Sequence, residues 1–229
     1  MQTTVVLAAA GPGTRLGATG PKAFVTLQEV PLFIHSLRSL LAAPAVSGTI
    51  VVVPPAEQAR AEEWLERLGP WRCRVRLAPG GAERQDSVRS GLDEVETGLV
   101  AVHDAARPFI DAEVIQAAVR IAAEHGAAIV ATPATDSLKQ VDPDGSIVTT
   151  IPRQDVWLAQ TPQVFRTEIL RDAHAAAAKV NLSATDDSAL VERLGFRVRV
   201  VRGNPENRKI TTAEDLRWAE WFLHQRSPR

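Results

Sequence analysis

The sequence predicts an α/β protein with a three-layer, Rossmann-like fold, in which a mostly parallel sheet carries helices on both faces. Three observations predict this class. Short β-branched apolar runs alternate with amphipathic stretches of about a dozen residues, as in βαβ units. Several runs are continuously apolar, which is typical of strands buried on both faces. The length of 229 residues suits one α/β domain, so we expect residues 1–229 to form a single domain.

Strands are predicted wherever an apolar run is short and closed by breaking residues. The run 49–53 is β-branched and ends at Pro54-Pro55, whereas 73–77 alternates with two arginines and has one polar face. The run 99–102 leads directly into His103 and Asp104. In chain order, strands are expected at 4–9, 49–53, 73–77, 99–102, 127–132 and 197–202.

Helices are predicted from apolar stripes with a period of 3.6 residues and from their end signals. Pro44 ends the first stripe, Asp111 is expected to be an N-cap, and Gly126 a stop. Thr212 and Asp215 form a predicted capping box for the C-terminal helix. In chain order, the other helices are expected at 31–43, 56–68, 85–94, 111–125, 167–178 and 185–194.

Residues 134–157 break this alternation of strands and helices. Two strand-like runs, 137–141 and 147–151, flank Asp142-Pro143-Asp144-Gly145, which is a hairpin turn signal. An isolated two-stranded hairpin is marginally stable in water, so it should pack against something. We expect a β-arm that forms a homodimer by docking on a partner subunit; the alternative is a solvent-exposed excursion.

The composition limits the ligands and the compartment. Lys and Arg number 26 and Asp and Glu 27, which gives a net charge of −1 and no overall field for nucleic acid or a membrane. A polyanionic ligand therefore needs a local cluster of positive groups. One cysteine, Cys73, excludes an internal disulfide framework, and no apolar run reaches membrane-spanning length. We expect a soluble, cytoplasmic protein without nucleic-acid or membrane partners.

A glycine-rich loop follows the first strand. The stretch from Leu7 to Lys22 reads LAAAGPGTRLGATGPK and contains two basic residues, Arg15 and Lys22. Leu16 breaks the dinucleotide fingerprint, and the residues around Lys22 do not match the Walker A pattern. Backbone N–H groups of such a loop and its two cations suit a triphosphate. The alternative is a tight strand-to-helix turn with incidental charges.

Other polar residues follow later strands, and the carboxyl ends of parallel strands meet at one edge of the sheet. Asp104 and Arg107 follow the fourth strand, Thr161 follows the arm, and Lys209 follows the last strand. Asp104 is a candidate for Mg²⁺, which takes one or two carboxylates and completes its shell with phosphates and water. The alternative is a turn or helix-capping aspartate. No histidine or cysteine pair has zinc-site spacing.

Six sequence blocks then identify a family resemblance. LAAAGPGTRLGATGPKAF, GGAERQDSV, VHDAARPF, LAQTPQVF, ATDDSALVE and GNPENRKITTAEDL resemble, in order and spacing, those of the 2-C-methyl-D-erythritol 4-phosphate cytidylyltransferases of the non-mevalonate isoprenoid pathway. The resemblance covers nearly the whole chain. It implies a nucleotide-diphospho-sugar transferase type of fold with a β-arm, and transfer of a cytidylyl group from CTP to 2-C-methyl-D-erythritol 4-phosphate with release of pyrophosphate. It also implies Mg²⁺ or another divalent cation.

The resemblance also implies roles for individual residues. The catalytic residues would be Arg15, Lys22, Arg153 and Lys209. The nucleotide would contact Ala9, Ala10, Gly11, Gly81, Ser87 and the metal-binding Asp104. The acceptor would contact Arg107, Ser137, Arg153, Thr161, Thr185 and Lys209, with Ser137 and Arg153 coming from the neighbouring subunit. Ser137 replaces the usual threonine and Ala82 a common acidic residue, and we expect little effect from either.

Ribitol 5-phosphate cytidylyltransferase, a sister enzyme with the same chemistry, is the nearest alternative. Ala9-Ala10-Gly11 and the segment from Asp104 to Arg107 favour the methylerythritol enzyme. A sugar-1-phosphate nucleotidylyltransferase is disfavoured because its loop begins with a Gly-Gly pair. A nucleotide-sensing regulator without catalysis is disfavoured by the retained metal, arm and lysine residues. His103 should be structural, because its side chain points to the opposite face from Asp104.

Overall fold

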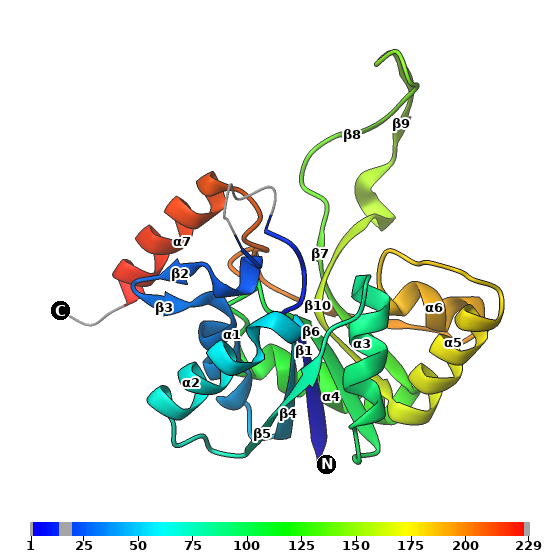
Figure 1. The fold of residues 1–229 in the computed structure, drawn as a ribbon. Coiled ribbons are helices and arrows are strands. Elements are labelled where there is room, and N and C mark those ends of the chain that lie inside the picture. The colour runs from blue at the N-terminus through cyan, green and yellow to red at the C-terminus, as the bar shows by residue number, and fades with distance from the viewer. Residues whose placement is uncertain (1, 14–19, 227–229) are drawn as a thin grey trace.

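The computed structural model describes residues 2–13 and 20–226, and its layers are shown in Figure 1. Seven strands form the main sheet in the order β11-β7-β10-β6-β1-β4-β5. All neighbouring pairs are parallel except those of β10, which runs antiparallel to both β6 and β7. The predicted mostly parallel sheet is therefore confirmed. Its strands are β1 (Thr3–Ala8), β4 (Val46–Val53), β5 (Arg74–Pro79), β6 (Leu99–Asp104), β7 (Ala127–Pro133), β10 (Trp157–Arg166) and β11 (Arg199–Arg202).

Helices cover both faces of this sheet, as predicted. One face carries α1, α2 and α4, and the other carries α3, α5 and α6 (Figure 1). The helices are α1 (Leu32–Leu41), α2 (Gln58–Leu68), α3 (Arg84–Asp93), α4 (Ala112–His125), α5 (Thr167–Lys179), α6 (Asp187–Arg193) and α7 (Ala213–Arg226). Shorter elements are β2 (Thr26–Leu27), β3 (Val30–Pro31) and the 3-10 turns η2 (Lys22–Phe24), η3 (Pro55–Glu57) and η4 (Arg153–Asp155). None of the described helices is long and apolar enough to cross a membrane.

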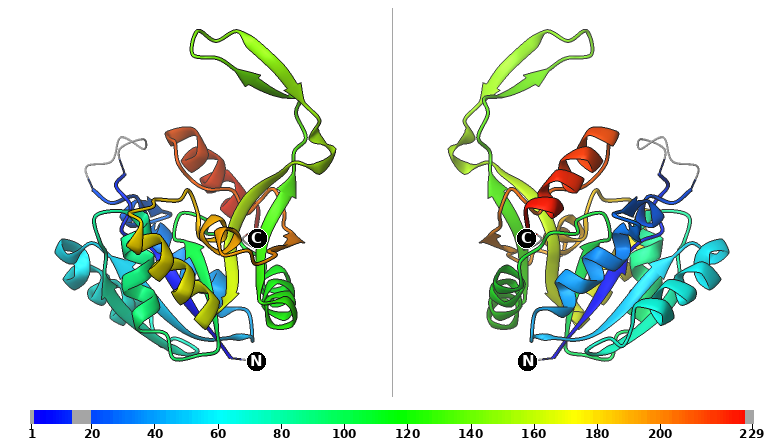
Figure 2. Two further views of the ribbon diagram at one scale, coloured as in Figure 1. Left: turned by 90° about the vertical axis from the view of Figure 1, so that its right-hand side faces the viewer. Right: turned by 90° about the vertical axis from the view of Figure 1, so that its left-hand side faces the viewer.

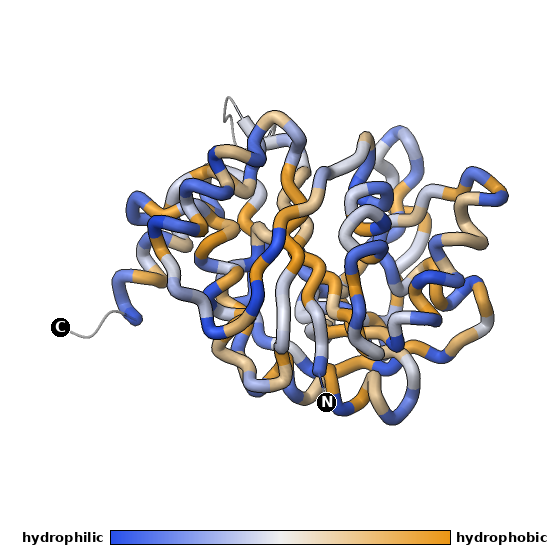
Figure 3. Tube along the Cα trace, turned by 60° about the horizontal axis from the view of Figure 1, so that its bottom comes forward, coloured by the Kyte–Doolittle hydropathy of each residue, from blue (hydrophilic) through white to orange (hydrophobic). Residues whose placement is uncertain are grey.

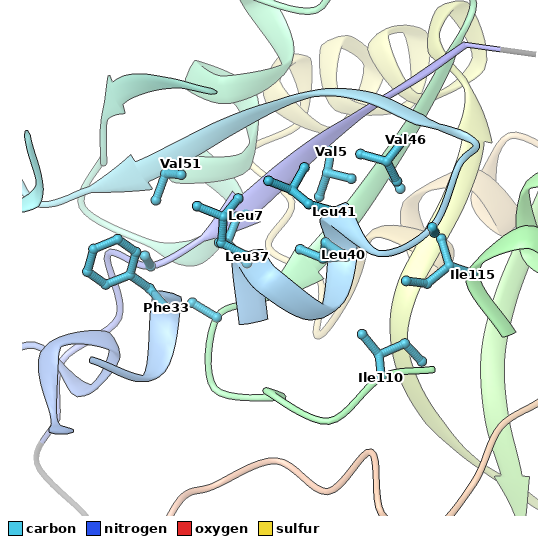
Figure 4. Close-up of a cluster of buried hydrophobic side chains, with 14 of the residues drawn as sticks. Val5, Leu7, Phe33, Leu37, Leu40, Leu41, Val46, Val51, Ile110 and Ile115 are labelled. Atoms are coloured by element: carbon cyan, nitrogen blue, oxygen red, sulfur yellow. The ribbon is translucent and has the colours of Figure 1, made fainter. Parts of the chain in front are cut away.

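Alternate residues of the central strands supply the two cores. Val5 and Leu7 of β1 pack against α1 and α4, whereas Val6 between them packs against α3 and α5. Figure 4 shows Val5 and Leu7 in the first cluster beside Leu37 and Leu40 of α1. Figure 3 shows hydrophobic stretches along the central strands. Burial on both faces explains why these strands are continuously apolar in sequence.

A third apolar cluster fixes the C-terminal helix. Leu27, Phe109 and Ile210 are buried together with residues of α7. The Phe109 ring contacts those of Trp218 and Phe222, at centroid distances of 5.9 and 4.9 Å. This cluster joins α7, the segment after β6 and the β2–β3 hairpin, and it anchors the segment that carries Lys209.

The predicted helix ends are borne out with one correction. Thr212 and Asp215 form the capping box: the Asp215 N–H donates to Thr212 Oγ1 at 3.2 Å, and the Thr212 N–H donates to Asp215 Oδ2 at 2.9 Å. Gly126 ends α4 with a φ of 94°. Asp111 does occupy the N-cap position of α4, but its side chain makes no capping bond. Its carboxylate oxygens are instead occupied, since Oδ2 accepts from Asn204 and Oδ1 accepts from Arg226.

The β-arm has the predicted hairpin. β8 (Leu138–Val141) and β9 (Ile147–Ile151) form a separate two-stranded sheet, and the turn between them places Gly145 at a φ of 87°. The arm projects from the body beyond β7 and β10 (Figure 2). Because the chain leaves and re-enters the sheet at the same end, β10 runs antiparallel to its neighbours. Sequence patterns left β10 unassigned, since the parallel-sheet rhythm stops at the arm.

Close packing of α3 on the sheet requires a glycine. A Cβ atom on Gly91 would lie 2.6 Å from Cγ1 of Val6 and 2.8 Å from Cγ2 of Val52. Both valines are buried in the core, and their χ1 rotamers are stiff. We expect Gly91→Ala to lower the free energy of unfolding by about 1–3 kcal/mol, although alanine is the better helix former. Urea unfolding measures this. Gly98→Ala, where a Cβ meets nothing within 4 Å, is the matched control, and an equal loss there would contradict the packing explanation.

Candidate functional site

A cavity opens at the carboxyl ends of β1, β5 and β6, where an open α/β sheet binds its ligands. Its walls come from the segment after β1, the turn between β5 and α3, the end of β6 and the loop before α7. The lining residues are Ala8, Ala9, Ala10, Gly11, Pro12, Lys22, Ala23, Gly81, Ala82, Glu83, Arg84, Ser87, Asp104, Ala105, Ala106 and Lys209.

One end of the cavity is narrow and lined by small residues. A Cβ atom on Gly80 would lie 2.4 Å from the Cβ of Ala10, so the two loops approach as closely as glycine allows. Ser87 braces the same turn: its hydroxyl accepts from the Gly81 N–H at 3.1 Å and donates to the carbonyl of Glu83 at 3.0 Å. These contacts fix the turn after β5 close against the segment after β1.

The other end carries charge. Asp104 Oδ2 lies 2.8 Å from Lys209 Nζ, and Asp104 Oδ1 lies 3.3 Å from Arg84 Nε. Burial by itself would raise the pKa of Asp104, but the charges of Lys209 and Arg84 outweigh it and hold that pKa well below its ordinary value. Asp104 is thus ionised at neutral pH. Lys22 also lines the cavity, and its backbone N–H donates to the carbonyl of Gly11 at 3.3 Å.

A buried chain of hydrogen bonds orients Asp104 from behind. His103 Nε2 donates to the carbonyl of Arg107 at 3.0 Å, so Nδ1 is free to accept from the Thr161 hydroxyl at 3.0 Å. Thr161 Oγ1 in turn accepts from the N–H of Asp104 at 3.0 Å. Burial lowers the pKa of His103 to about 4, which agrees with the neutral ring this chain requires. His103 is a structural residue, as its alternation with Asp104 predicts.

A second buried group holds the loop that carries Lys209. Asn207 is fully buried and donates to the carbonyl of Thr161 at 2.8 Å and to Gln160 Oε1 at 3.0 Å. Its own backbone carbonyl accepts from Arg107 Nη1 at 2.8 Å. The loop before α7 is therefore fixed to β10 on one side and to the segment after β6 on the other. This explains how Lys209 reaches Asp104 from a distant part of the chain.

The structure places the residues named in the sequence analysis in different parts of the molecule. Those that line the cavity are Ala9, Ala10, Gly11, Lys22, Gly81, Ser87, Asp104 and Lys209. Arg107 and Thr161 lie behind Asp104, and Thr185 is exposed before α6. Ser137 and Arg153 are exposed on the arm, where Arg153 donates to the carbonyl of Thr135. Arg15 lies outside the described residues.

Arg84 is the principal lining residue that the sequence analysis did not assign. Its signal was present in the block GGAERQDSV, where it follows the glycine pair at the start of a helix. Arg84 also contacts Asp187 of α6, with Nη1 2.8 Å from Oδ2. The charges of Asp187 and Asp104 outweigh the effect of burial and raise the pKa of Arg84 above its ordinary value.

For metal binding, the site offers one carboxylate. Among the described residues, no group of three or more His, Cys, Asp or Glu side chains is placed to hold a metal ion. Asp104 is ionised and lines the cavity. A single carboxylate of this kind fits a hard cation such as Mg²⁺ that takes its other ligands from phosphate oxygens and water.

The fold is a sheet between two layers of helices, with a projecting arm and a cavity that has one narrow and one charged end. These features define an α/β protein of the nucleotidyltransferase type, and similar solved structures agree. The structure of 2-C-methyl-D-erythritol 4-phosphate cytidylyltransferase from Thermus thermophilus has a TM-score of 0.81 at 32% identity and covers 98% of this chain and 100% of its own. The structure of 4-diphosphocytidyl-2C-methyl-D-erythritol synthase from Anaerococcus prevotii has a TM-score of 0.84 at 25% identity, with 98% of each chain covered.

Sequence comparison identifies the family. The profile of IspD, 2-C-methyl-D-erythritol 4-phosphate cytidylyltransferase, matches residues 3–225. Relatives of the same name from Acidobacterium capsulatum and Pelotomaculum thermopropionicum are 45% and 43% identical. The first covers 100% of both chains, and the second 98% of this chain and 95% of its own. The chain belongs to the 2-C-methyl-D-erythritol 4-phosphate cytidylyltransferase family.

The low pKa of Asp104 makes the stability of the fold depend on pH. An unfolded chain has an Asp pKa of about 3.9, and the folded value lies below it, so the stabilisation is complete above about pH 5 and is lost as the pH falls. We expect wild type to exceed Asp104→Asn in unfolding free energy by a constant amount at about pH 5–7 and by less below about pH 4. Urea unfolding across this range measures the difference. A difference that grew on acidification would contradict the assignment.

Proposed function

We propose that this protein transfers a cytidylyl group from CTP to 2-C-methyl-D-erythritol 4-phosphate and releases pyrophosphate. The product would be 4-(cytidine 5′-diphospho)-2-C-methyl-D-erythritol. Membership of the family supports the reaction, and one observation supports the site: a single cavity joins an end lined by small residues to a cluster of cations around Asp104. CTP has a matching arrangement, because a small, flat pyrimidine base is joined through the ribose to a negatively charged triphosphate.

The cytosine would occupy the narrow end. Ala9, Ala10, Gly11 and Gly81 line this end beside Ser87, and the close approach of Gly80 to Ala10 would disfavour a purine. Backbone groups of the two loops would read the amine and ring nitrogen of the base. A site built from such hydrogen-bonding groups discriminates more strongly than one that relies on shape alone.

The triphosphate would occupy the charged end. Attack by the acceptor phosphate on the α-phosphorus of CTP brings two anions together, so fixed positive charge and alignment are the main requirements. Lys22, Lys209 and Arg15 would neutralise the charge that develops on the pyrophosphate leaving group. A phosphate monoester is already a nucleophile, and the neutral, buried His103 is not needed as a base.

Asp104 would hold the divalent cation. Both of its oxygens face cations in the cavity, and this supports a preference for positive charge at the same position. A bound Mg²⁺ would add charge beside the phosphates of the nucleotide.

The acceptor would lie toward Arg107, Thr161 and Thr185, and residues from the arm of a second subunit would also contact it.

We propose that residues 1–229 are one domain and that the arm, 134–157, makes a homodimer. The arm and its base expose six large hydrophobic side chains, and burial of such surface drives association. They are Val141, Ile147, Val148, Ile151, Trp157 and Leu158. Ser137 and Arg153 would then enter the partner's site.

The net charge of −1 and the single cysteine suit a cytoplasmic enzyme of small-molecule substrates.

A substrate panel tests the reaction. With Mg²⁺ present, we expect pyrophosphate release from CTP and 2-C-methyl-D-erythritol 4-phosphate, and at least about 100-fold lower kcat/KM with ATP in place of CTP. Ribitol 5-phosphate should be a poor acceptor. A coupled assay for pyrophosphate measures all combinations. A preference for ribitol 5-phosphate would contradict the proposed acceptor. Equal activity with ATP and CTP would contradict the proposed pyrimidine site.

Subunit mixing tests the arm. Lys22→Ala and Arg153→Ala should each be nearly inactive alone, because each removes a charge from every site. If Arg153 acts in the partner's site, a hybrid dimer contains one site with both residues intact. Random mixing should then restore about one quarter of wild-type activity, because half of the dimers are hybrids and each has one intact site. Activity is measured before and after mixing, with light scattering as the check of dimer mass. Full activity of Arg153→Ala alone would show that Arg153 has no part in the reaction, and no recovery between dimeric, exchanging inactive proteins would show that it acts within its own subunit.

A further inference from the structure

A buried acidic residue lies behind the charged end of the cavity, and the reaction proposed above does not use it. The guanidinium of Arg84 is held between two carboxylates: Nε lies 3.3 Å from Asp104 Oδ1, and Nη1 lies 2.8 Å from Asp187 Oδ2. Asp104 lines the cavity. Asp187 is the first residue of α6 and is 1% exposed, so it holds Arg84 from the protein side.

Asp187 is itself fixed by two neighbouring elements. His174 of α5, 2% exposed, donates from Nε2 to Asp187 Oδ1 over 3.1 Å. Gln163 of β10 accepts with Oε1 from the backbone N–H groups of Asp187 and Ser188, at 3.1 and 3.0 Å. The side chain and the backbone of Asp187 are therefore both held, and its orientation toward Arg84 is set before any ligand binds.

The start of α3 is joined to the segment before α6 by more than this ion pair. Gln85 donates to the carbonyl of Leu182 at 3.0 Å and accepts from the N–H of Ala184 at 3.1 Å. Glu83 accepts from the hydroxyl of Ser183 at 3.1 Å. Three consecutive side chains at the start of α3 thus bind one segment. Arg84 is held in this contact and is not a freely rotating surface side chain.

The negative charge on Asp187 stabilises its ion pair with Arg84. Burial alone would raise the pKa of Asp187, but the hydrogen bond from His174 and the charge of Arg84 outweigh burial and lower it. Among the described residues, Arg84 is the one lysine or arginine within ion-pair distance of Asp187. Removing Arg84 would leave the buried carboxylate of Asp187 without this cation, which is costly.

The two carboxylates therefore differ in what they do for Arg84. Asp104 has further cations, Lys209 at 2.8 Å and Arg107 at 3.8 Å, and it faces the cavity. It can lose Arg84 to a phosphate oxygen and remain paired. Asp187 is buried away from the cavity, so a phosphate cannot replace it as the partner of Arg84. The Asp187–Arg84 ion pair therefore persists when a ligand binds.

We propose that Asp187 and His174 are positioning residues that hold the Arg84 guanidinium at the charged end of the cavity, where it binds the β- and γ-phosphates of CTP. This inference rests on the proposed function, since it takes CTP as the ligand. Neither positioning residue touches the nucleotide. Asp187 fixes Arg84 by charge and hydrogen bond, and His174 fixes the rotamer of Asp187.

Binding of CTP and of CMP to the full-length protein tests this proposal. Asp187→Asn removes the charge and keeps the shape. We expect about tenfold weaker binding of CTP, because a charge-assisted contact to the terminal phosphates is lost, and less than about a twofold change for CMP, which lacks them. Calorimetry measures both affinities, and thermal unfolding confirms that the variant is folded. A purely structural defect would weaken both ligands equally and would overturn the proposal.

Three further variants complete the test. Arg84→Gln should give the same selective loss, and adding Asp187→Asn to it should cause no further loss, because the two residues act as one unit. His174→Leu should weaken CTP binding selectively, while His174→Gln, which keeps a donor, should restore it. Glu94→Gln removes a carboxylate from the Arg76 ion pair outside the cavity and should change neither affinity.

The outcomes separate this inference from the proposed function. Wild-type protein that binds ATP as well as CTP would contradict the proposed function. Wild-type protein that prefers CTP, together with Asp187→Asn and His174→Leu variants that bind CTP normally, would overturn the positioning role alone. If Asp187→Asn does not fold, His174→Leu and His174→Gln decide, because they leave the ion pair in place.

Discussion

The ionised carboxylate of Asp104 is the interaction on which the arrangement of the site depends. Lys209 and Arg84 come from opposite sides of the cavity and would repel each other without a shared anion. Asp104 lies at the end of β6, so the sheet fixes its position. Its carboxylate in turn holds the side chains of Lys209 and Arg84. Because the carboxylate is nearly buried, it must stay paired, and the two basic side chains remain in place without a ligand.

The strand that departs from the parallel pattern supports this carboxylate. β10 enters the sheet between β6 and β7 and places Thr161 against the backbone of Asp104. The same strand contributes Gln160, which binds Asn207 and so holds the loop of Lys209. The arm precedes β10 directly. The arm interrupts the alternation of strands and helices, and it also reverses the chain so that β10 runs antiparallel to β6 and β7. This direction places Gln160 and Thr161 beside the site.

Local sequence patterns predicted the parallel strands, the two helical layers, the hairpin and the capping box of α7, because each depends on neighbours in the sequence. Three of the residues that line the cavity, Lys22, Asp104 and Lys209, follow strands whose carboxyl ends must meet, and the other five were named from the family resemblance. The pattern could not assign β10, whose direction depends on the path of the arm. Nor could it show that Arg84 meets Asp187, 103 residues away, or that Asp111 uses its carboxylate for Asn204 and Arg226.

The ion pairs also bear on the kind of ligand that the cavity accepts. A phosphate that draws Lys209 and Arg84 toward itself takes both cations from Asp104, and an unpaired charge at such a buried position costs about 3–5 kcal/mol. Arg107, 3.8 Å from Asp104 Oδ2, offsets only part of that cost. The exchange therefore favours a polyanion that arrives with its own cation over a bare monoanion. The pairing of Asp104 before the ligand enters therefore supports the metal-bound CTP of the proposed function.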